Sequence, residues 1–454
     1  MRPLLTRCLL LFLFGGLACI RTVLADSVLK EPGSDDRVYS VRCRLQVNGT
    51  LRTAAGQGQA NELELKVDGR LSYLERRLAA AGRDSHTLRS VRSYGLAEAE
   101  IDVGERRTLN RLPDSLRLIV AEGRAGGIRH WSTSRPMTSD AINLLHTPGD
   151  SLALIPLLPD VEIEEKSEWS PPHWVLPTLT GVEAVSKSEL TCRIDSLDDR
   201  YAVIAVEGQI EGAILGALTK VTLRGKIAYD RTAGHIRQAQ ITQKEERAVG
   251  TVTPGMNVTA TMYVDRQVSE SSGALTERLV ESLPLNPEAA QLAVAFVSKS
   301  DTYLLLDRDW HVFHQTDDVA VLRLVDGGSL IAQCNVSRLP RVPAGSHTPG
   351  PQFAADIQTA LGEQLNEISD VQPIPLGDDR TLLRVVARGR SRNVPMSWYY
   401  YLCAAPDGRQ LACVFSLESR LAESFEGRDE ELVRSIRFLT AAERTASSPQ
   451  PPTR

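Results

Sequence analysis

Long runs in which apolar and polar side chains alternate one by one constrain the fold of this chain more than any other feature. From Tyr39 to Val47 every second residue is apolar, and from Val221 to Tyr229 every second residue is apolar or glycine. A period of two places alternate side chains on opposite faces of a β-strand. The pattern therefore predicts antiparallel strands with one apolar face and one face in water.

These strands fall into two groups, one before Pro136 and one after Gly181. We expect both groups to form one sheet of roughly ten strands, which is too large to stay flat and therefore curls. The dipeptides Asn48-Gly49 and Asp68-Gly69, and later Glu211-Gly212, predict turns between strands.

A short helical insert, near residues 138–180, separates the two groups of strands. Thr138 or Ser139 can cap a helix that ends at Leu145, and the apolar segment 149–158 predicts a second, buried helix. We expect the helices of this insert to cover the apolar face of the curved sheet.

A second, smaller unit is predicted from about residue 299. Four expected strands lead to a helix that Gly350-Pro351 opens, and three more strands lead to a closing helix from Asp429 to Phe438. The fold class is therefore α+β. It combines a large curved antiparallel β-sheet, or half-barrel, that carries a short helical insert with a smaller antiparallel α/β sandwich domain.

The N-terminus has the pattern of an export signal. Arg2 and Arg7 precede the apolar run Cys8 to Ile20, and Val23-Leu24-Ala25 offers a cleavage site. The apolar run is too short to span a bilayer, so we expect no transmembrane anchor in the mature chain. The protein is expected to be periplasmic or extracellular with a cleaved signal peptide, and lipidation at Cys19 is the weaker alternative.

Cysteine usage does not indicate a disulfide framework. The segment after the signal peptide has an odd number of cysteines, so at least one thiol stays free unless two chains are bridged. Cys403 and Cys413 flank a hairpin turn at Pro406-Asp407-Gly408, but in the expected registers they lie diagonally or on opposite faces. A bridge between them is a weak possibility. These cysteines are Cys43, Cys192, Cys334, Cys403 and Cys413.

No recognised catalytic motif or cofactor motif occurs in the sequence, so we expect no catalytic residues and no cofactor. His311 and His314 lie near several aspartates. On a strand, however, residues three apart point to opposite faces, and no metal site is predicted. The formal net charge is −5 and no dense Lys/Arg run is present, which argues against nucleic acid as a partner.

Trp131, Trp169 and Trp174 cluster around the helical insert in the sequence. They are candidates for lining a ligand site. The plainer interpretation is that they pack in the core and in the cover over the sheet, since aromatic side chains supply large buried areas.

Two stretches carry resemblances to known families. The order of strands, helices and strands over residues 37–266 resembles, in topology alone, the LolA-type open-barrel carriers of the bacterial envelope. In the second unit, Asp309-Trp310-His311 after an opening strand and Phe425 to Asp429 before a closing helix resemble the PsbP-like fold. These resemblances imply a bacterial envelope protein with a binding or accessory role rather than an enzyme.

The function predicted from the sequence is that of an exported, non-enzymatic binding or accessory protein of the cell envelope, with a hydrophobic small molecule or lipid held in the N-terminal sheet. A structural or protein-interaction module with an envelope partner and no ligand is the alternative, and a hydrolase with dispersed catalytic residues ranks third. Ligand identity, partner and oligomeric state stay open. The predicted layout is a signal peptide (1–25), an N-terminal linker (26–36), a curved β domain (37–266), a linker or connecting helix (267–298), a PsbP-like α+β domain (299–439) and a disordered tail (440–454).

Overall fold

The structure is a computed structural model of the 454-residue chain. It describes residues 28–54, 60–79, 88–124, 126–284, 286–440 and 443. The predicted signal peptide, Cys19 and most of the predicted tail lie outside these residues. Among the described residues, no helix is long and apolar enough to cross a membrane.

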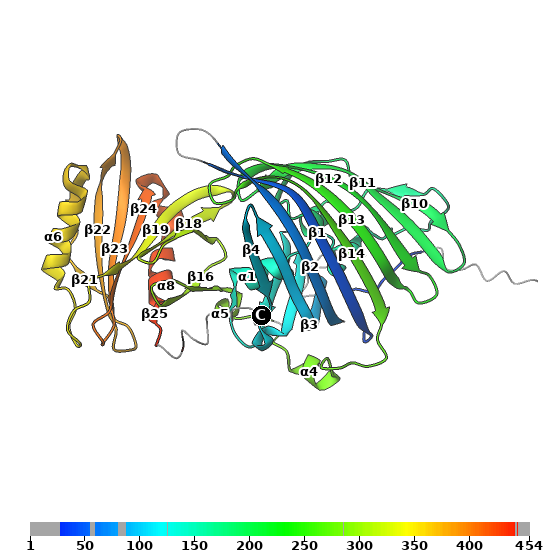
Figure 1. Cartoon of the computed structure of the whole chain (residues 1–454), viewed down its shortest axis with the longest axis horizontal. Coiled ribbons are helices and arrows are strands. Elements are labelled where there is room, and N and C mark those ends of the chain that lie inside the picture. The colour runs from blue at the N-terminus through cyan, green and yellow to red at the C-terminus, as the bar shows by residue number, and fades with distance from the viewer. Residues whose placement is uncertain are drawn as a thin grey trace, which may run out of the picture.

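A thirteen-stranded sheet dominates the N-terminal part of the chain and curves over the elements beneath it (Figure 1). Its main path runs β6-β5-β3-β2-β1-β14-β13-β12-β11-β10-β8, with β4 and β9 as side branches. Its strands are β1 (Val38–Ala54), β2 (Ala60–Leu78), β3 (Leu88–Val103), β4 (Arg106–Arg111), β5 (Leu118–Arg124), β6 (Gly127–Ser132), β8 (Glu168–Trp169), β9 (Ala184–Ser188), β10 (Thr191–Leu197), β11 (Tyr201–Ile214), β12 (Ala217–Asp230), β13 (His235–Arg247) and β14 (Gly255–Val268).

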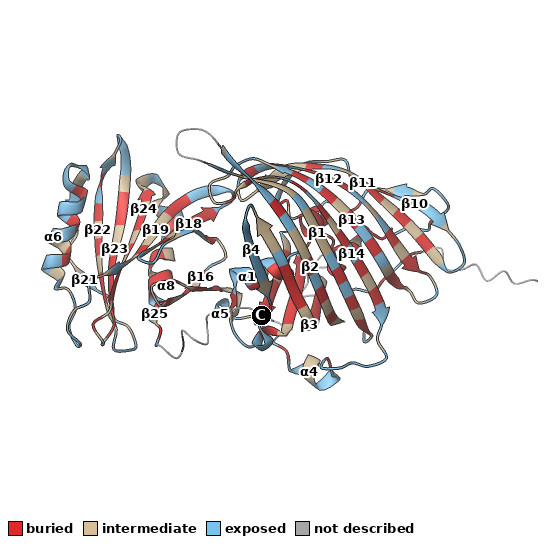
Figure 2. Cartoon of the chain, in the orientation of Figure 1, coloured by how far each residue is buried: buried red, intermediate tan, exposed pale blue. Residues whose placement is uncertain are grey.

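The pairing of β1 with β14 joins the two groups of strands into one surface. The two strands are antiparallel over fourteen residue pairs, from Tyr39 opposite Val268 to Arg52 opposite Gly255. The prediction that both groups belong to one sheet is confirmed. The alternation also has the predicted result, because Val221, Leu223 and Ile227 are all buried on the inner face. Figure 2 shows this alternation as bands of buried and exposed residues along the strands.

The helical insert lies against the concave side of the sheet. It comprises α1 (Ser139–Leu145), α2 (Ser151–Leu154), η2 (Ile155–Leu157) and α3 (Val175–Thr180). The Thr138 hydroxyl accepts a hydrogen bond from the Ala141 N–H and caps α1, as predicted. Helix α3 was not predicted, because Pro177 lies within it and the preceding Pro-rich stretch indicates irregular backbone.

The C-terminal unit contains two further sheets. Helix α6 packs on one face of the eight-stranded sheet, while α8 lies on the other side of that sheet (Figure 1). The four-stranded sheet consists of β7 (Met137–Thr138), β15 (Val294–Val297), β16 (Thr302–Leu306) and β25 (Arg437–Phe438). The eight-stranded sheet consists of β17 (Trp310–Gln315), β18 (Val319–Asp326), β19 (Ser329–Leu339), β20 (Leu365–Ile368), β21 (Gln372–Pro373), β22 (Thr381–Ser391), β23 (Val394–Ala404) and β24 (Gln410–Glu418). The remaining elements are η1 (Asp114–Leu116), α4 (Glu277–Ser282), α5 (Ala289–Leu292), α6 (Gly350–Leu361), η3 (Gly362–Gln364), η4 (Ser419–Leu421), α7 (Ala422–Phe425) and α8 (Arg428–Arg434).

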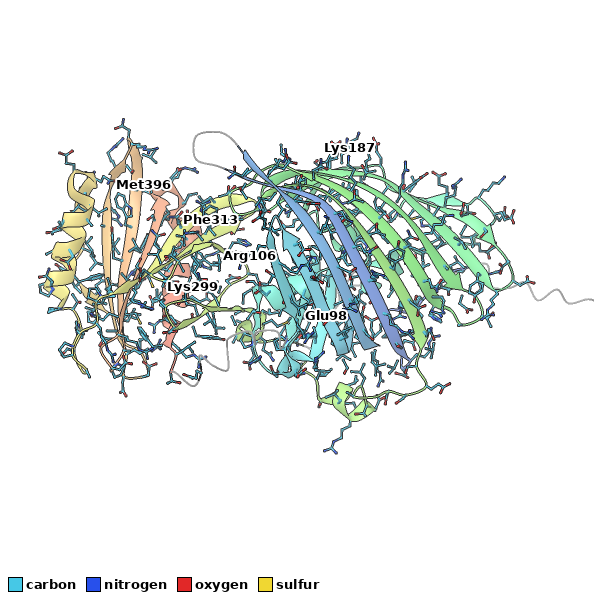
Figure 3. All side chains as sticks on the ribbon, in the orientation of Figure 1. Glu98, Arg106, Lys187, Lys299, Phe313 and Met396 are labelled. Atoms are coloured by element: carbon cyan, nitrogen blue, oxygen red, sulfur yellow. The ribbon has the colours of Figure 1, made fainter. Side chains whose placement is uncertain are left out.

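The two units share backbone contacts. Strand β7, just before α1, pairs in parallel with β15, so the entrance to the insert is part of the C-terminal sheet system. Two side chains of the C-terminal unit also reach the N-terminal unit: the Arg308 guanidinium donates to the carbonyl oxygen of His130, and Arg323 donates to the carbonyl oxygen of Thr251. Exposed side chains such as those of Lys187 and Phe313 project from the two units (Figure 3). The α+β class is confirmed.

Three predicted turns are wrong. Asn48-Gly49 and Asp68-Gly69 lie inside β1 and β2, and Glu211-Gly212 lies inside β11, which turns only at Leu215-Gly216. At Gly49 the glycine serves a close approach between strands, because a Cβ atom there would lie 2.1 Å from the Asn257 carbonyl oxygen. The predicted closing helix is also too long, since α8 ends at Arg434 and residues 437–438 form β25.

The cysteines that the structure describes are all free. Cys403 lies opposite Leu411, and Cys413 lies opposite Tyr401, so the two cysteines are diagonal neighbours in the hairpin. The possible Cys403–Cys413 bridge is therefore absent, for the geometric reason that the sequence already indicated.

We predict that Gly49→Ala lowers the free energy of unfolding by about 2–3 kcal/mol, because the added methyl group meets the backbone of β14 and the φ of +154° is unfavourable for alanine. Urea unfolding followed by circular dichroism measures this change. Gly126→Ala is the matched control: it has nothing within 4 Å of its Cβ position and should change stability by less than about 0.5 kcal/mol. Equal stability of the two variants would contradict the prediction.

Candidate ligand-binding site

The concave face of the curved sheet and the insert form one apolar cluster. Two buried cysteines, Cys43 and Cys192, belong to it. We call this surface the covered face. On the sheet side it includes Val41, Cys43, Leu71, Ala97, Cys192, Ile204, Val206, Val221, Leu223, Ile241, Met262 and Val264, and on the insert side Leu145, Leu152, Leu154, Leu157, Val175 and Leu179.

Side chains of the insert occupy the space over the covered face in this structure. Leu145, Leu152 and Leu179 have no exposed surface. Burial of each such side chain contributes about 1.5–3 kcal/mol. The insert therefore takes the position that an apolar ligand would need, and a ligand can reach the sheet only if the insert moves away.

The three tryptophans occupy different positions. Trp169, on β8, lies opposite Cys192 and donates from its indole N–H to the Leu157 carbonyl at 3.1 Å. Trp174, just before α3, packs half-buried against the same apolar cluster as Trp169. Trp131 is fully buried on β6, outside the cluster under the insert. The structure thus places two of the three at the covered face, and their role in lining a ligand site stays a prediction.

A cluster of buried charges lies beneath α2. Arg92 on β3 forms a bidentate ion pair with Asp150, with Nη1 to Oδ2 at 2.7 Å and Nη2 to Oδ1 at 2.6 Å. Its Nε donates to the Glu75 carboxylate of β2 at 2.9 Å. Ser151 donates to the same Glu75 oxygen at 2.8 Å. We call Arg92, Glu75, Asp150, Ser151 and the adjacent His130 the Arg92 cluster.

The Arg92 cluster fastens the insert to the sheet. Asp150 is also the N-cap of α2, because its Oδ1 accepts from the Leu152 N–H at 2.9 Å. The same carboxylate thus starts the helix and holds it to β3. A bidentate Arg–carboxylate pair fixes orientation as well as distance. The pair therefore holds α2 in one position and orientation on the sheet.

The cluster is incompletely satisfied. Among the described residues, Oε2 of Glu75 and Nδ1 of His130 are buried without a hydrogen-bond partner. Burial lowers the pKa of His130 well below its usual value, and the neighbouring Arg92 adds to the shift. The ring is therefore neutral at pH 7. A partly satisfied buried network loses part of the stabilisation that complete pairing would give.

Sequence reasoning missed the Arg92 cluster, although a signal was present. Glu75 follows Leu71 and Tyr73 at inward positions of β2, and Arg92 takes an inward position on β3. Opposite charges at inward positions of neighbouring strands indicate a buried pair, since a lone buried charge is too costly. No structural signal in the sequence revealed that Asp150 would join them.

The segment before β1 closes one end of the covered face. Leu29 is buried in the apolar cluster, and the Glu31 carboxylate pairs with the buried guanidinium groups of Arg77 and Arg266. Burial alone would raise the pKa of Glu31, but the two arginines outweigh it and hold the pKa below its usual value. The predicted linker 26–36 therefore includes residues that form part of the core.

Comparisons with known proteins give no family. No protein-family model matches the chain, and no curated protein matches its sequence. A solved structure from Bacteroides thetaiotaomicron aligns over 33% of this chain and 49% of its own, with 9% identity and a TM-score of 0.24. Lipovitellin, in a structure concerned with lipid–protein interactions, aligns over 58% of this chain and 27% of its own, with 11% identity and a TM-score of 0.28. This chain thus spans about half and about a quarter of those proteins.

The translocator domain of the autotransporter NalP from Neisseria meningitidis aligns over 85% of this chain with a TM-score of 0.13 and 8% identity. TM-scores this low carry no argument about fold or function. Nothing in these comparisons supports the LolA-type or the PsbP-like resemblance.

We predict that Asp150→Ala destabilises the protein by about 3–5 kcal/mol, because it leaves the buried Arg92 charge without its bidentate partner and removes the cap of α2. Urea unfolding measures the change. Asp68→Ala, which breaks the exposed Arg44–Asp68 pair, is the control and should cost less than about 1 kcal/mol. Comparable costs for both variants would show that the Arg92 cluster does not anchor the insert.

We also predict that stability falls as the pH drops below about 6.5. The pKa of His130 is lowered in the folded state, so the unfolded chain binds more protons in this range and protonation favours unfolding. The contribution of His130 to the free energy of unfolding is complete above the pKa that this histidine has in the unfolded chain. It is lost as the pH falls toward the lower pKa that it has in the folded chain. His130→Gln should reduce the difference in unfolding free energy between pH 7.5 and about pH 5. An unchanged difference in this variant would assign the pH dependence to other groups.

Proposed function

We propose that this chain is an exported, non-enzymatic binding protein that holds an apolar ligand between the curved sheet and its helical insert. The observation that carries the proposal is the construction of the cover. A large one-sided sheet has its apolar face covered by short helices of seven, four and six residues, and a buried ion cluster fastens α2.

A ligand can restore the hydrophobic burial that the sheet loses when the insert lifts. When the insert lifts, the covered face loses contact with side chains such as Leu152 and Leu179. An acyl chain or another apolar ligand can bury the same sheet surface in their place. The free energy of opening is then set largely by the Arg92–Asp150 pair and by the exposed insert side chains, and the partly satisfied state of the cluster lowers this cost.

The packed interior also fits the alternative function. In that case the insert is permanent core, the N-terminal unit is a scaffold, and the protein acts through a stoichiometric protein partner in the envelope. The two functions differ in one measurable property, which is whether the covered face becomes available to an apolar molecule while the rest of the chain stays folded.

The absence of catalysis and the export of the chain belong to the proposal as well. They rest on the N-terminal signal pattern and on the lack of catalytic motifs in the sequence. The two carboxylates, the arginine and the serine of the Arg92 cluster are explained by fastening α2, because their hydrogen bonds join the insert to the sheet.

The test is the binding of a fluorescent fatty acid, cis-parinaric acid, to the full chain. We predict that wild type binds it and that Asp150→Asn binds it more tightly, because the weakened ion pair raises the population of the open state and the apparent Kd falls in proportion. Asp195→Asn is the control and should bind as wild type does, since Asp195 pairs with Lys226 at the outer surface.

Failure of both wild type and Asp150→Asn to bind the probe, together with an absence of extracted lipid in mass spectra of the purified protein, would reject the ligand and leave the scaffold function.

A further inference from the structure

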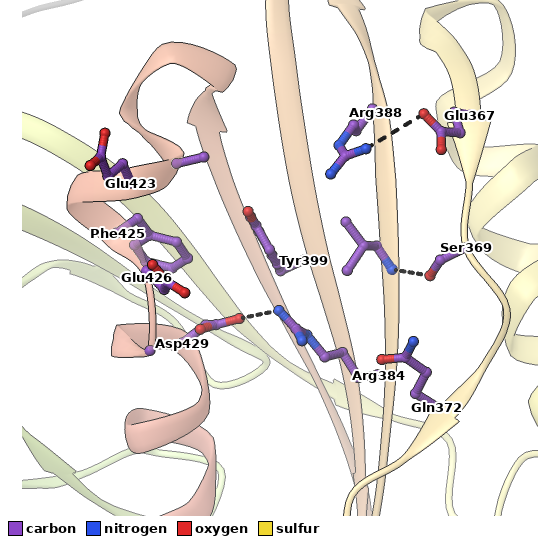
Figure 4. Close-up of a pocket in the computed structure, with 13 residues that line it drawn as sticks. Glu367, Ser369, Gln372, Arg384, Arg388, Tyr399, Glu423, Phe425, Glu426 and Asp429 are labelled. Carbon is purple, nitrogen blue, oxygen red and sulfur yellow. Dashed lines mark hydrogen bonds and ion pairs between the residues drawn. The ribbon is translucent and has the colours of Figure 1, made fainter.

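A hollow lies on the C-terminal unit, away from the covered face. It is a cleft of about 550 Å³ over the face of the eight-stranded sheet opposite α6 (Figure 4). This volume is in the range of sites for small organic ligands. Its floor is formed by Arg384, Val386 and Arg388 of β22 and Tyr399 of β23, one wall by Glu367, Ser369 and Gln372, and the other wall by residues 422–429.

Alternation along β22 places the arginines in the cleft. Leu383, Val385 and Ala387 point toward α6 and form its apolar contact. The intervening Arg384 and Arg388 therefore face the opposite side, where the cleft lies. The wall that carries Glu423, Phe425, Glu426 and Asp429 consists of α7, the residues that follow it and the first turn of α8. Part of this stretch, Phe425 to Asp429, also carries the PsbP-like resemblance.

Arg384 is a guanidinium with spare hydrogen-bonding capacity. Its Nη2 lies 3.3 Å from Asp429, whose shorter hydrogen bond, of 2.6 Å, comes from the Tyr401 hydroxyl. Among the described residues, the buried Nε of Arg384 has no partner. The guanidinium lies 5.4 Å from the centre of the Tyr399 ring, which is within the range of a cation–π contact. A guanidinium presents five N–H donors, so this arrangement is prepared for an anionic acceptor.

Both walls of the cleft carry negative charge. On one wall, the exposed carboxylates of Glu423 and Glu426 have no cation paired with them within the part of the chain that the structure describes. On the other wall, the Glu367 carboxylate lies 3.6 Å from the Arg388 guanidinium. Four carboxylates and two arginines thus line the cleft. A phosphate with two negative charges is disfavoured among four carboxylates. A ligand with one carboxylate and a positive charge at its other end complements the arginines of the floor and the carboxylates of the wall at residues 422–429.

We propose that the cleft binds a short peptide with a free carboxyl terminus and a positively charged end. The carboxylate lies on Arg384, and the ammonium groups lie against Glu423 and Glu426. This site is independent of the covered face, and no bond is made or broken there.

The test uses the tripeptide Lys-Ala-Ala, its C-terminal amide and Ala-Ala-Ala, titrated into the full chain by isothermal calorimetry. We expect Lys-Ala-Ala to bind wild type, and amidation of its carboxylate to weaken binding about tenfold or more. In Arg384→Gln the free and amidated peptides should bind equally weakly. Arg390→Gln, on the same strand but outside the cleft, is the matched control and should bind as wild type does.

A second variant keeps the proposal testable if Arg384→Gln does not fold. The double substitution Glu423→Gln and Glu426→Gln changes two exposed side chains and should weaken Lys-Ala-Ala about tenfold. It should weaken Ala-Ala-Ala less, because that peptide carries one ammonium group where Lys-Ala-Ala carries two. No binding of Lys-Ala-Ala to wild type, or equal binding of its free and amidated forms, would overturn the proposal.

Discussion

The antiparallel pairing of β1 with β14 is the interaction on which the rest of the structure depends. It joins strands that are more than two hundred residues apart into one sheet, with Tyr39 opposite Val268. The joined sheet has one apolar face too large to leave in water. The chain meets this requirement with the short helices between β6 and β9, so the structure of the cover follows from the pairing of the sheet.

Apolar contact alone leaves the position of this cover weakly defined, because hydrophobic attraction has no direction. The Arg92 cluster defines the position of α2. Asp150 caps this helix and also accepts hydrogen bonds from both terminal nitrogens of Arg92. An anchor made of buried charges also costs desolvation, so it fixes geometry more than it adds stability. The proposed binding role rests on this combination. The apolar packing of the insert on the sheet can be exchanged for a ligand, while the Arg92–Asp150 pair returns the insert to one position.

The sequence predicted the features that repeat and missed those that depend on tertiary contact. Alternation predicted the buried row of Val221, Leu223 and Ile227 and the single curved sheet. The turn signal of the dipeptide failed at Asn48-Gly49, where glycine serves a close approach to β14 rather than a turn. The Arg92 cluster and the cleft that contains Arg384 were not predicted, because each combines side chains from segments that only folding brings together.

The most direct test of the central claim is the labelling rate of each cysteine, measured by mass spectrometry on the native chain. Burial raises the pKa of both Cys43 and Cys192 to about 12, so these thiols react only when the insert lifts. We expect Cys43 and Cys192 to react faster than the three buried cysteines of the C-terminal unit. Their labelling rates should depend little on denaturant concentration, because local opening exposes little surface. Reaction of all five at one rate, equal to that of global unfolding, would contradict this expectation.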